Sequence, residues 1–274
     1  MYDLDNQQSL VQLDLGGTEP VPGILQLPRR DDPVPAVLLL HGFTSHKSDM
    51  ARSIGHALYL HGVASLAIDL PMHGERLGVP SDLPIRNPLA LVTTWHLALR
   101  EAGLAVAYLA GVRGIDRNRI AIAGYSLGAY LSVCLAAKEP GICAVALTAG
   151  GDLPSVIPFI PLVRTIVDPC EAVRQLSGRP LLLMNGKRDR RIRPEDANAL
   201  FAAACEPKEQ RWYDGGHWPP SSAMVDVAEW LVNRLEARPS APSSPLAAQE
   251  DSSRAPLRRT PSRSRFRTRL DPSR

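Results

Sequence analysis

The chain has 274 residues, 45% of them hydrophobic, and a formal net charge of +3. This length allows one large domain with a substantial core, which excludes a small disulfide-stapled scaffold and a fibrous protein. The opening sequence, MYDLDNQQSLVQLDL, has no basic region followed by an apolar run. It therefore predicts no secretory signal, and we expect a cytoplasmic protein.

The N-terminal segments LVQLDL (10–15) and PGILQLP (22–28) predict two strands that form an antiparallel hairpin at a sheet edge. From about residue 34, short apolar runs alternate with helical patterns. The apolar runs are 36–40, 63–69, 119–124, 143–150, 180–186 and 210–215. Because these runs are continuous rather than alternating, they predict strands covered on both faces, as in a parallel sheet.

The helical patterns occupy residues 48–60, 88–111, 127–138, 194–204 and 221–236. Together with the strands they predict an α/β protein with a mostly parallel, doubly wound sheet of about eight strands and helices on both faces. Residues 150–179, which contain four prolines, predict a small insertion after the sixth strand. We expect one domain over residues 1–236.

The longest apolar stretch, Leu89 to Val112, carries Arg100 and Glu101 at its centre. Each charge would cost about 2.5 to 3.5 kcal/mol inside a bilayer, so the stretch predicts a soluble helix. Asn87 is the expected cap of this helix and Pro88 its first residue.

Residues 237–274 carry nine arginines and three acids and are rich in proline and serine. This composition predicts a disordered tail, because so few apolar residues cannot offset the entropy cost of ordering. A solvated extension is the favoured interpretation. Binding of nucleic acid or an anionic membrane through phosphate contacts is the alternative.

The four cysteines show no paired spacing and no accompanying histidine cluster. They predict buried free thiols rather than a metal site.

Ser126 stands between Gly124 and Gly128 in GYSLG, where a strand pattern gives way to helix formers. The G-x-S-x-G spacing permits a sharp turn that lifts the hydroxyl out of the sheet. A tight turn with a capping serine is the simpler interpretation. The pentapeptide resembles the nucleophile elbow of the α/β-hydrolase superfamily, and the similarity is greatest to small bacterial carboxylesterases and to dienelactone-hydrolase-like and prolyl-oligopeptidase-like serine hydrolases.

A serine requires a base, usually a histidine held by an acid. The resemblance implies the chain order serine, acid, histidine. Of the seven histidines, only His217 in DGGHW follows Ser126. Asp189 lies in the loop after the penultimate predicted strand and matches the family pattern Gly-x-x-Asp-x-x-x-Pro, with Pro194 one residue late.

Three other aspartates compete with Asp189 for this role. Asp196 follows a proline and is better explained as an acid in the first turn of a helix. Asp152 and Asp214 are weaker rivals, since neither occupies the loop after the penultimate strand.

The resemblance also implies an oxyanion hole formed by the backbone amides of Phe43, in HGF, and Leu127. His41 is then structural. The loop Asp69–Arg76 resembles a segment that borders the family's active site. His73, Glu75 and Arg76 could therefore touch substrate, and a hydrogen-bonded scaffold is an equally good interpretation.

Tyr125 and Trp218 complete the predicted substrate pocket. These residues predict a serine hydrolase that cleaves small-molecule carboxylic esters, without metal or cofactor. The short insertion favours short acyl groups. A thioesterase and an aminopeptidase-type acyl hydrolase use the same residues and remain alternatives. A non-catalytic ligand-binding relative is disfavoured because no member of the triad is missing, and a dehalogenase would need aspartate at position 126.

Overall fold

The computed structural model describes residues 8–14, 19–76, 88–154, 160–176 and 178–237. The predicted tail, apart from Ala237, lies outside the described residues, as does the predicted helix cap Asn87.

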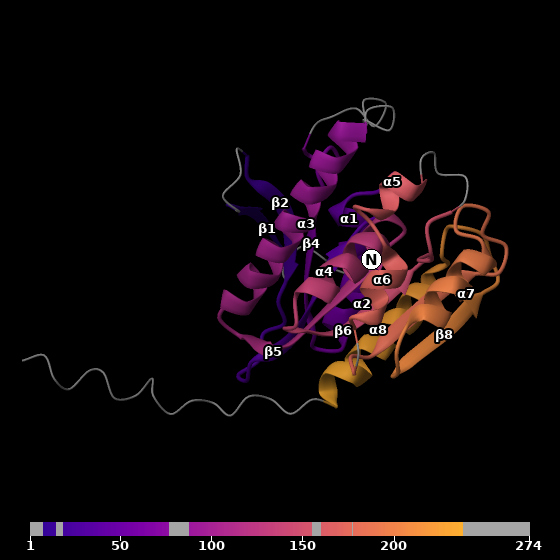
Figure 1. The fold of residues 1–274 in the computed structure, drawn as a ribbon. Helices are drawn as coiled ribbons and strands as arrows, with labels where there is room; N and C mark the ends of the chain where they lie inside the picture. Colours follow the sequence, from indigo (N-terminus) through magenta and orange to yellow (C-terminus); the bar gives the residue numbers. More distant parts are fainter. Residues whose placement is uncertain (1–7, 15–18, 77–87, 155–159, 177, 238–274) are drawn as a thin grey trace, which may run out of the picture. The chain divides into compact units, whose positions relative to one another are not determined.

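Eight strands and their connecting helices follow one another along the described residues (Figure 1). The strands are β1 (Gln8–Leu13), β2 (Val21–Gln26), β3 (Val34–Leu40), β4 (Ala64–Ile68), β5 (Ile115–Tyr125), β6 (Ile142–Thr148), β7 (Leu181–Gly186) and β8 (Lys208–Tyr213). The helices are α1 (Lys47–Met50), η1 (Ala51–Gly55), α2 (His56–Leu60), α3 (Pro88–Gly111), α4 (Leu127–Lys138), α5 (Ile160–Arg164), α6 (Pro169–Arg174), α7 (Pro194–Ala203) and α8 (Ser221–Glu236).

The strands form one sheet in the order β1-β2-β4-β3-β5-β6-β7-β8. β1 pairs with β2 and β2 pairs with β4 in antiparallel fashion, and every other pair is parallel. The predicted edge hairpin and the predicted mostly parallel sheet are confirmed. The carboxyl ends of β3, β5, β7 and β8 therefore lie along the same edge of the sheet, where open α/β sheets hold ligands.

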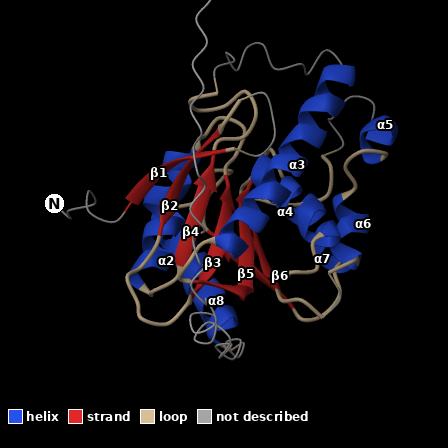
Figure 2. Ribbon diagram, turned by 90° about the vertical axis from the view of Figure 1, so that its left-hand side faces the viewer, coloured by secondary structure: helices blue, strands red, loops and turns tan. Residues whose placement is uncertain are grey.

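Helices cover both faces of the sheet (Figure 2). On one face α3, α4, α6 and α7 pack against alternate strand residues, and on the other α1, η1, α2 and α8 do so. β3 is buried along its whole length, with Leu38 and Leu40 facing the first core and Val37 and Leu39 the second. This two-sided burial explains why the strands are continuously apolar.

Several elements differ in detail from their predicted form. β5 begins at Ile115, earlier than the apolar run suggests. The predicted helix 48–60 consists of three consecutive segments, α1, η1 and α2, of which η1 is a π-helical turn. The described part of the insertion contains two short helices, α5 and α6.

Helix α3 begins at Pro88, as predicted. One of the two charged residues at its centre, Glu101, forms a buried ion pair with Arg76. Its Glu101 is 5% exposed and accepts two hydrogen bonds from the guanidinium of Arg76. No helix among the described residues is long and apolar enough to cross a bilayer.

The four cysteines are free thiols, as predicted. Cys134 and Cys143 are buried and Cys170 is partly buried, but Cys205 is exposed. The expectation of burial is therefore wrong for Cys205, which follows Ala204, the C-cap residue of α7.

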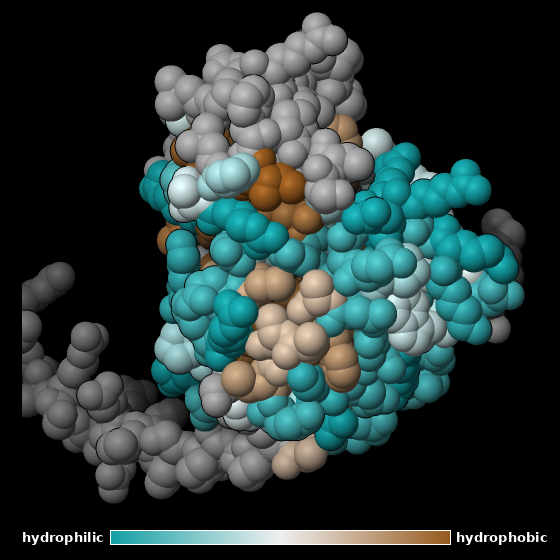
Figure 3. Space-filling model, turned by 45° about the vertical axis from the view of Figure 1, so that its right-hand side comes forward, coloured by the Kyte–Doolittle hydropathy of each residue, from teal (hydrophilic) through white to brown (hydrophobic). Residues whose placement is uncertain are grey.

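The face seen in Figure 3 is mostly hydrophilic, with hydrophobic side chains gathered near its middle. Over the described residues, the large exposed hydrophobic side chains are Leu10, Leu60, Leu91, Tyr108, Trp218 and Val225. Three of them, Leu60, Trp218 and Val225, line a single groove. An exposed apolar surface of this kind often marks a binding site.

Candidate active site

Ser126 occupies the turn between β5 and α4 and has φ 51° and ψ −111°. Such a conformation is strained for a residue with a side chain and is typical of functional turns. The neighbouring glycines permit it. A Cβ atom on Gly124 would collide with the carbonyl of Gly128, and one on Gly128 would collide with the carbonyl of Leu40. The pentapeptide thus folds as a sharp strand-to-helix turn with the serine at its tip.

His217 and Asp189 reach Ser126 from the loops after β8 and β7. Nε2 of His217 lies 2.9 Å from Oγ of Ser126, and Nδ1 lies 2.8 Å from Oδ2 of Asp189. His217 and Asp189 are both buried. The three side chains form one hydrogen-bonded series that joins three separate strand ends.

Asp189 is held as a carboxylate by its surroundings. Its second oxygen accepts hydrogen bonds from the backbone N–H groups of Arg191, at 2.8 Å, and Ile192, at 3.1 Å. Burial acts to raise the pKa of Asp189, but the hydrogen bonds from His217 and the two amides outweigh it, so this pKa lies below its ordinary value. The carboxylate is therefore oriented and charged where it faces the imidazole.

The three rival aspartates have other partners. Asp196 accepts the backbone N–H of Arg193 in the first turn of α7, at 3.0 Å, as predicted for a helix-start acid. Asp152 is bound to the guanidinium of Arg164 at 2.6 Å. Asp214 is exposed and pairs with Arg188. The structure brings Asp189 alone of these four to His217.

The loop after β3 approaches the amino-terminal end of α4. Within the described residues, the backbone N–H groups of Phe43 and Leu127 have no hydrogen-bond partner. The contact of Gly128 with the carbonyls of Leu40 and His41 brings the two segments together. Two unpartnered amides beside a serine are the arrangement that an oxyanion requires.

His41 fixes the shape of this loop. Its Nδ1 donates to the carbonyl of Gly42 at 2.7 Å, and its Nε2 accepts the backbone N–H of Leu70 at 3.0 Å. Burial lowers the pKa of His41 to about 4. His41 is thus a neutral side chain whose two ring nitrogens are both bound to backbone, in line with the structural role expected for it.

An ion cluster, with Lys47 and Asp69 buried and Glu75 exposed, holds the loop that follows β4. Lys47, at the start of α1, binds Asp69 at 2.7 Å and Glu75 at 2.5 Å. The backbone amides of Lys47 and Glu75 donate to the same Asp69 carboxylate. Burial opposes ionisation of Asp69, but the bonds from Lys47 outweigh it and lower its pKa. The cluster joins the start of α1 to the loop after β4, and no pattern in the sequence indicates this role for Lys47.

The predicted substrate contacts in this loop have protein partners. The two ring nitrogens of His73 face the carbonyls of Pro71 and Phe43, at 2.8 Å and 2.5 Å. Arg76 forms an ion pair with Glu101, and Glu75 forms one with Lys47. The geometry favours the scaffold interpretation over direct contact with substrate.

Two tyrosine hydroxyls form hydrogen bonds with the backbone carbonyl of His217. The hydroxyls of Tyr125 and Tyr213 each lie 3.3 Å from its carbonyl oxygen, to which they donate. Both tyrosines are buried, and burial raises their pKa well above the ordinary value. Tyr125 belongs to the GYSLG pentapeptide, so the sequence places it near Ser126. No sequence pattern indicates that Tyr213 contacts His217. Tyr213 ends a half-exposed edge strand, and its contact depends on the turn of the following loop.

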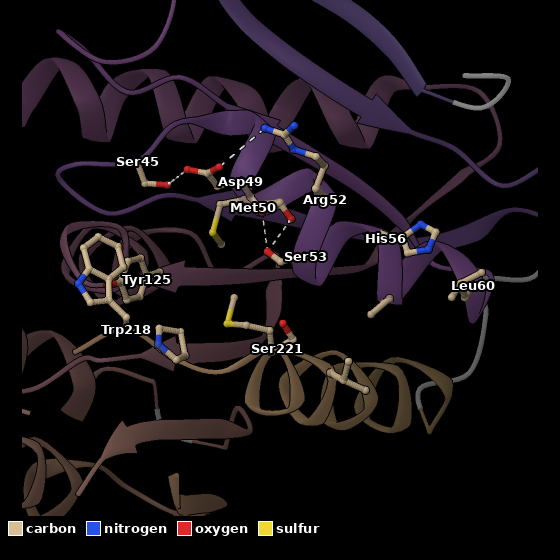
Figure 4. Close-up of a pocket in the computed structure, with 14 residues that line it drawn as sticks. Ser45, Asp49, Met50, Arg52, Ser53, His56, Leu60, Tyr125, Trp218 and Ser221 are labelled. Carbon is tan, nitrogen blue, oxygen red and sulfur yellow. Dashed lines mark hydrogen bonds and ion pairs between the residues drawn. The ribbon is translucent and has the colours of Figure 1, made fainter. Parts of the chain in front are cut away.

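A groove of about 530 Å³ opens beside this site (Figure 4). α1, η1 and α2 form one wall, the start of α8 forms the other, and Tyr125 and Trp218 stand at one end. The ring of Trp218 lies 5.8 Å from that of Tyr125 and meets His217 edge-on at 6.1 Å. Tyr125 and Trp218 therefore border this groove, and their contact with substrate stays a prediction.

No group of histidine, cysteine and carboxylate side chains within the described residues could hold a metal ion.

The strand order, the turn at Ser126 and the arrangement of three side chains after β5, β7 and β8 define an α/β-hydrolase. Residues 8–156 match the model of the esterase FrsA-like family. This match spans more than half of the 274 residues, and the chain belongs to the FrsA-like esterase family. The matched segment includes Ser126 and ends before Asp189 and His217.

Two curated relatives show the reach of the sequence similarity. An uncharacterized protein of Mycobacterium tuberculosis strain H37Rv is 29% identical over 193 residues, which cover 68% of this chain and 64% of that protein. Esterase YjfP of Escherichia coli K12 is 29% identical over 200 residues, which cover 65% of this chain and 78% of that protein. The chain thus spans less than two thirds of the length of its mycobacterial relative.

Among solved structures, TT1662 from Thermus thermophilus superposes with a TM-score of 0.70 at 24% identity, over 85% of this chain and all of that one. At this identity the likeness establishes the fold. The predicted α/β-hydrolase fold is thereby confirmed.

Proposed function

We propose that the protein is a serine esterase that hydrolyses carboxylic esters of small molecules through an acyl-enzyme. Ser126 is the nucleophile, His217 the general base and Asp189 the acid that orients it. The observation that supports this most is the continuous series Ser126–His217–Asp189, with distances of 2.9 Å and 2.8 Å, beside two unpartnered amides.

In the first half-reaction, Oγ of Ser126 attacks the ester carbonyl carbon while its proton passes to Nε2 of His217. The C–O bond to the alcohol then breaks, and His217 returns the proton to the departing alcohol oxygen. Ser126 is left carrying the acyl group. A water molecule repeats the sequence: it attacks the acyl carbon, gives its proton to His217 and releases the acid and the free serine.

Asp189 keeps His217 in the required tautomer. Its Oδ2 accepts the proton on Nδ1, which leaves Nε2 unprotonated and able to take the proton of the serine. The carboxylate also stabilises the imidazolium that forms. Its lowered pKa keeps it charged well below neutral pH.

The amides of Phe43 and Leu127 stabilise the negative charge on the carbonyl oxygen as the tetrahedral intermediate forms. One such donor is worth about 3 to 4 kcal/mol in the transition state. Leu127 is the first residue of α4, so the positive end of the helix dipole adds to this effect. His73 supports Phe43 by its contact with the carbonyl of the same residue.

We extend the proposal to short acyl groups, because the insertion at 150–179 is short for a full lid. The groove beside Trp218 offers an apolar surface for the rest of the molecule.

The test is a panel of p-nitrophenyl esters of increasing acyl length, with thioesters and aminoacyl anilides alongside. Ser126→Ala should lower ester turnover by about four to six orders of magnitude, because the three residues act as a unit. An organophosphonate should label Ser126 alone, as read by mass spectrometry. Ser222→Ala, which changes an exposed serine at the start of α8, is the matched control and should keep its activity.

An alanine variant of Ser126 that folds and retains more than a tenth of the ester turnover would refute the assignment of the nucleophile. Faster turnover of thioesters or anilides than of esters would move the protein to one of the alternative hydrolase classes.

A further inference from the structure

The loop that carries Asp189 is strongly basic. Five of the seven residues from 187 to 193 are cationic and exposed: Lys187, Arg188, Arg190, Arg191 and Arg193. Exposed charges are common on protein surfaces. This loop, however, also positions the acid of the proposed triad, so its charges stand beside the reacting atoms.

Only part of this charge is neutralised. Arg188 pairs with Asp214 at 2.8 Å, and Arg193 pairs with Asp196 at 3.3 Å. Across the described ranges, Lys187, Arg190 and Arg191 take part in no ion pair. A positive potential therefore remains at this side of the site and attracts anions.

Arg191 contacts both Asp189 and Trp218. Its backbone N–H is fixed on Asp189, and its guanidinium carbon lies 6.0 Å from the ring centre of Trp218. Burial raises the pKa of Tyr125, and the charge of Arg191 acts in the opposite direction. Tyr125 and Trp218 line the same groove. Trp218 in turn meets His217 edge-on. Arg191 thus stands at the Trp218 end of the groove.

The side of the substrate that faces Arg191 follows from the mechanism. His217 must deliver its proton to the oxygen of the departing alcohol, so the alcohol portion lies on the His217 side of the ester. Trp218 is the next residue in the chain, and it is 57% exposed, so its ring can pack against a bound alcohol group. An alcohol portion that leaves the site over Trp218 runs toward Arg191.

We propose that the substrates of this enzyme are esters whose alcohol portion carries a negatively charged group, which Arg191 binds beside Trp218. The proposal rests on the esterase function argued above. Lys187 and Arg190 add attraction at longer range. A carboxylate and a phosphate share the necessary chemistry, since both accept the paired N–H groups of a guanidinium.

The experiment compares two acetyl esters of the same shape, 4-acetoxybenzoate, which is anionic, and 4-acetoxybenzamide, which is neutral. The measured quantity is the ratio of their kcat/KM values, because comparing this ratio between variants cancels the intrinsic reactivity of each ester. We expect Arg191→Gln to lower the anionic-to-neutral ratio by about threefold to tenfold, as for one partly screened charge pair. Arg191→Lys should keep most of the ratio, since the charge is retained.

Salt gives a second readout that a structural role of Arg191 would not produce. In the wild type, kcat/KM for 4-acetoxybenzoate should fall as the NaCl concentration rises from about 0.02 to about 0.5 M, and this dependence should weaken in Arg191→Gln. The matched control is Arg174→Gln, which removes an exposed ion-paired arginine on α6 and should leave the ratio and its salt dependence unchanged. 4-Acetoxyphenyl phosphate adds a phosphate arm to the comparison.

Equal ratios in the wild type and Arg191→Gln would overturn the proposal. So would a charge effect confined to the acyl side, measured with p-nitrophenyl hydrogen adipate against p-nitrophenyl hexanoate. If none of these esters is hydrolysed, the esterase function itself fails and this proposal falls with it. Hydrolysis without charge discrimination leaves the esterase function standing and removes only the substrate class.

Discussion

Acidification should destabilise this fold through His41. The side chain has no exposed surface, and its Nε2 must stay unprotonated to accept the N–H of Leu70. Protonation would break this bond and bury a charge. The pKa is accordingly lowered by burial from 6.5 to about 4. In an unfolded chain the same imidazole would keep its ordinary value.

The size and sign of the effect follow from linkage. Between pH 6.5 and pH 4 the unfolded state binds more protons than the folded state, so the free energy of unfolding falls as the pH falls. Well below pH 4, the full difference between the pKa of His41 in the unfolded and folded states would lower the free energy of unfolding by about 3 kcal/mol. Between pH 7 and pH 5 about 2 kcal/mol of it should be lost. The contribution is fully present above pH 6.5.

The assay is urea unfolding followed by tryptophan fluorescence at pH 7 and pH 5, for the wild type and for His41→Gln. Both proteins lose stability on acidification through their other groups, but the loss should be about 2 kcal/mol smaller in the variant, whose side chain does not titrate. The comparison uses the change with pH, so the absolute stability of the variant does not matter. Equal losses in the two proteins, or an NMR titration of His41 near its ordinary pKa of 6.5, would refute the reasoning.

Three further predictions concern the site. Asp189→Asn should lower ester turnover by about four orders of magnitude, because the asparagine favours the wrong tautomer of His217. Asp196→Asn should leave ester turnover within about threefold of the wild type. If steady-state kinetics show the large loss in Asp196→Asn instead, Asp196 is the acid that orients His217. Tyr213→Phe should lower kcat by about threefold to tenfold because the carbonyl of His217 loses one donor, and an unchanged kcat would show that Tyr125 suffices. Gly128→Ala should lower the melting temperature, since its Cβ would displace backbone at a cost of about 1 to 3 kcal/mol; an unchanged melting temperature would contradict the close approach.

Much of the fold could be predicted because its strands are buried on both faces. The continuous run at β3 is apolar at every position that packs against a helix, whereas a strand with one face in water would alternate apolar and polar residues. The antiparallel strands β1 and β2 are each one residue shorter than β3, and the glycine and proline residues near their ends mark them off in the sequence. The boundary of β5 is less predictable, because Asp116 to Arg119 are polar and the pairing of β5 with β3 is interrupted between Ile115 and Ile120.

The sequence predicts those residues of the candidate site whose position relative to a predicted strand indicates their role. The position of each residue after a predicted strand indicates Ser126, Asp189 and His217, and the structure brings them together. The supports around them depend on contacts between distant segments. The ion pair of Arg76 with Glu101 and the bond of Tyr213 to His217 have no local pattern, so they require the folded chain.

The distance in sequence between Ser126 and His217 bears on how the chain is made. The two residues are 91 positions apart, and β8 is the last strand of the sheet. At ribosomal rates of about 5 to 20 residues per second, roughly 5 to 18 s separate their synthesis. If Ser126 and His217 act as proposed, the serine has no base during that interval and is a weak nucleophile. The nascent chain should then form no acyl-enzyme until its final strand has joined the sheet.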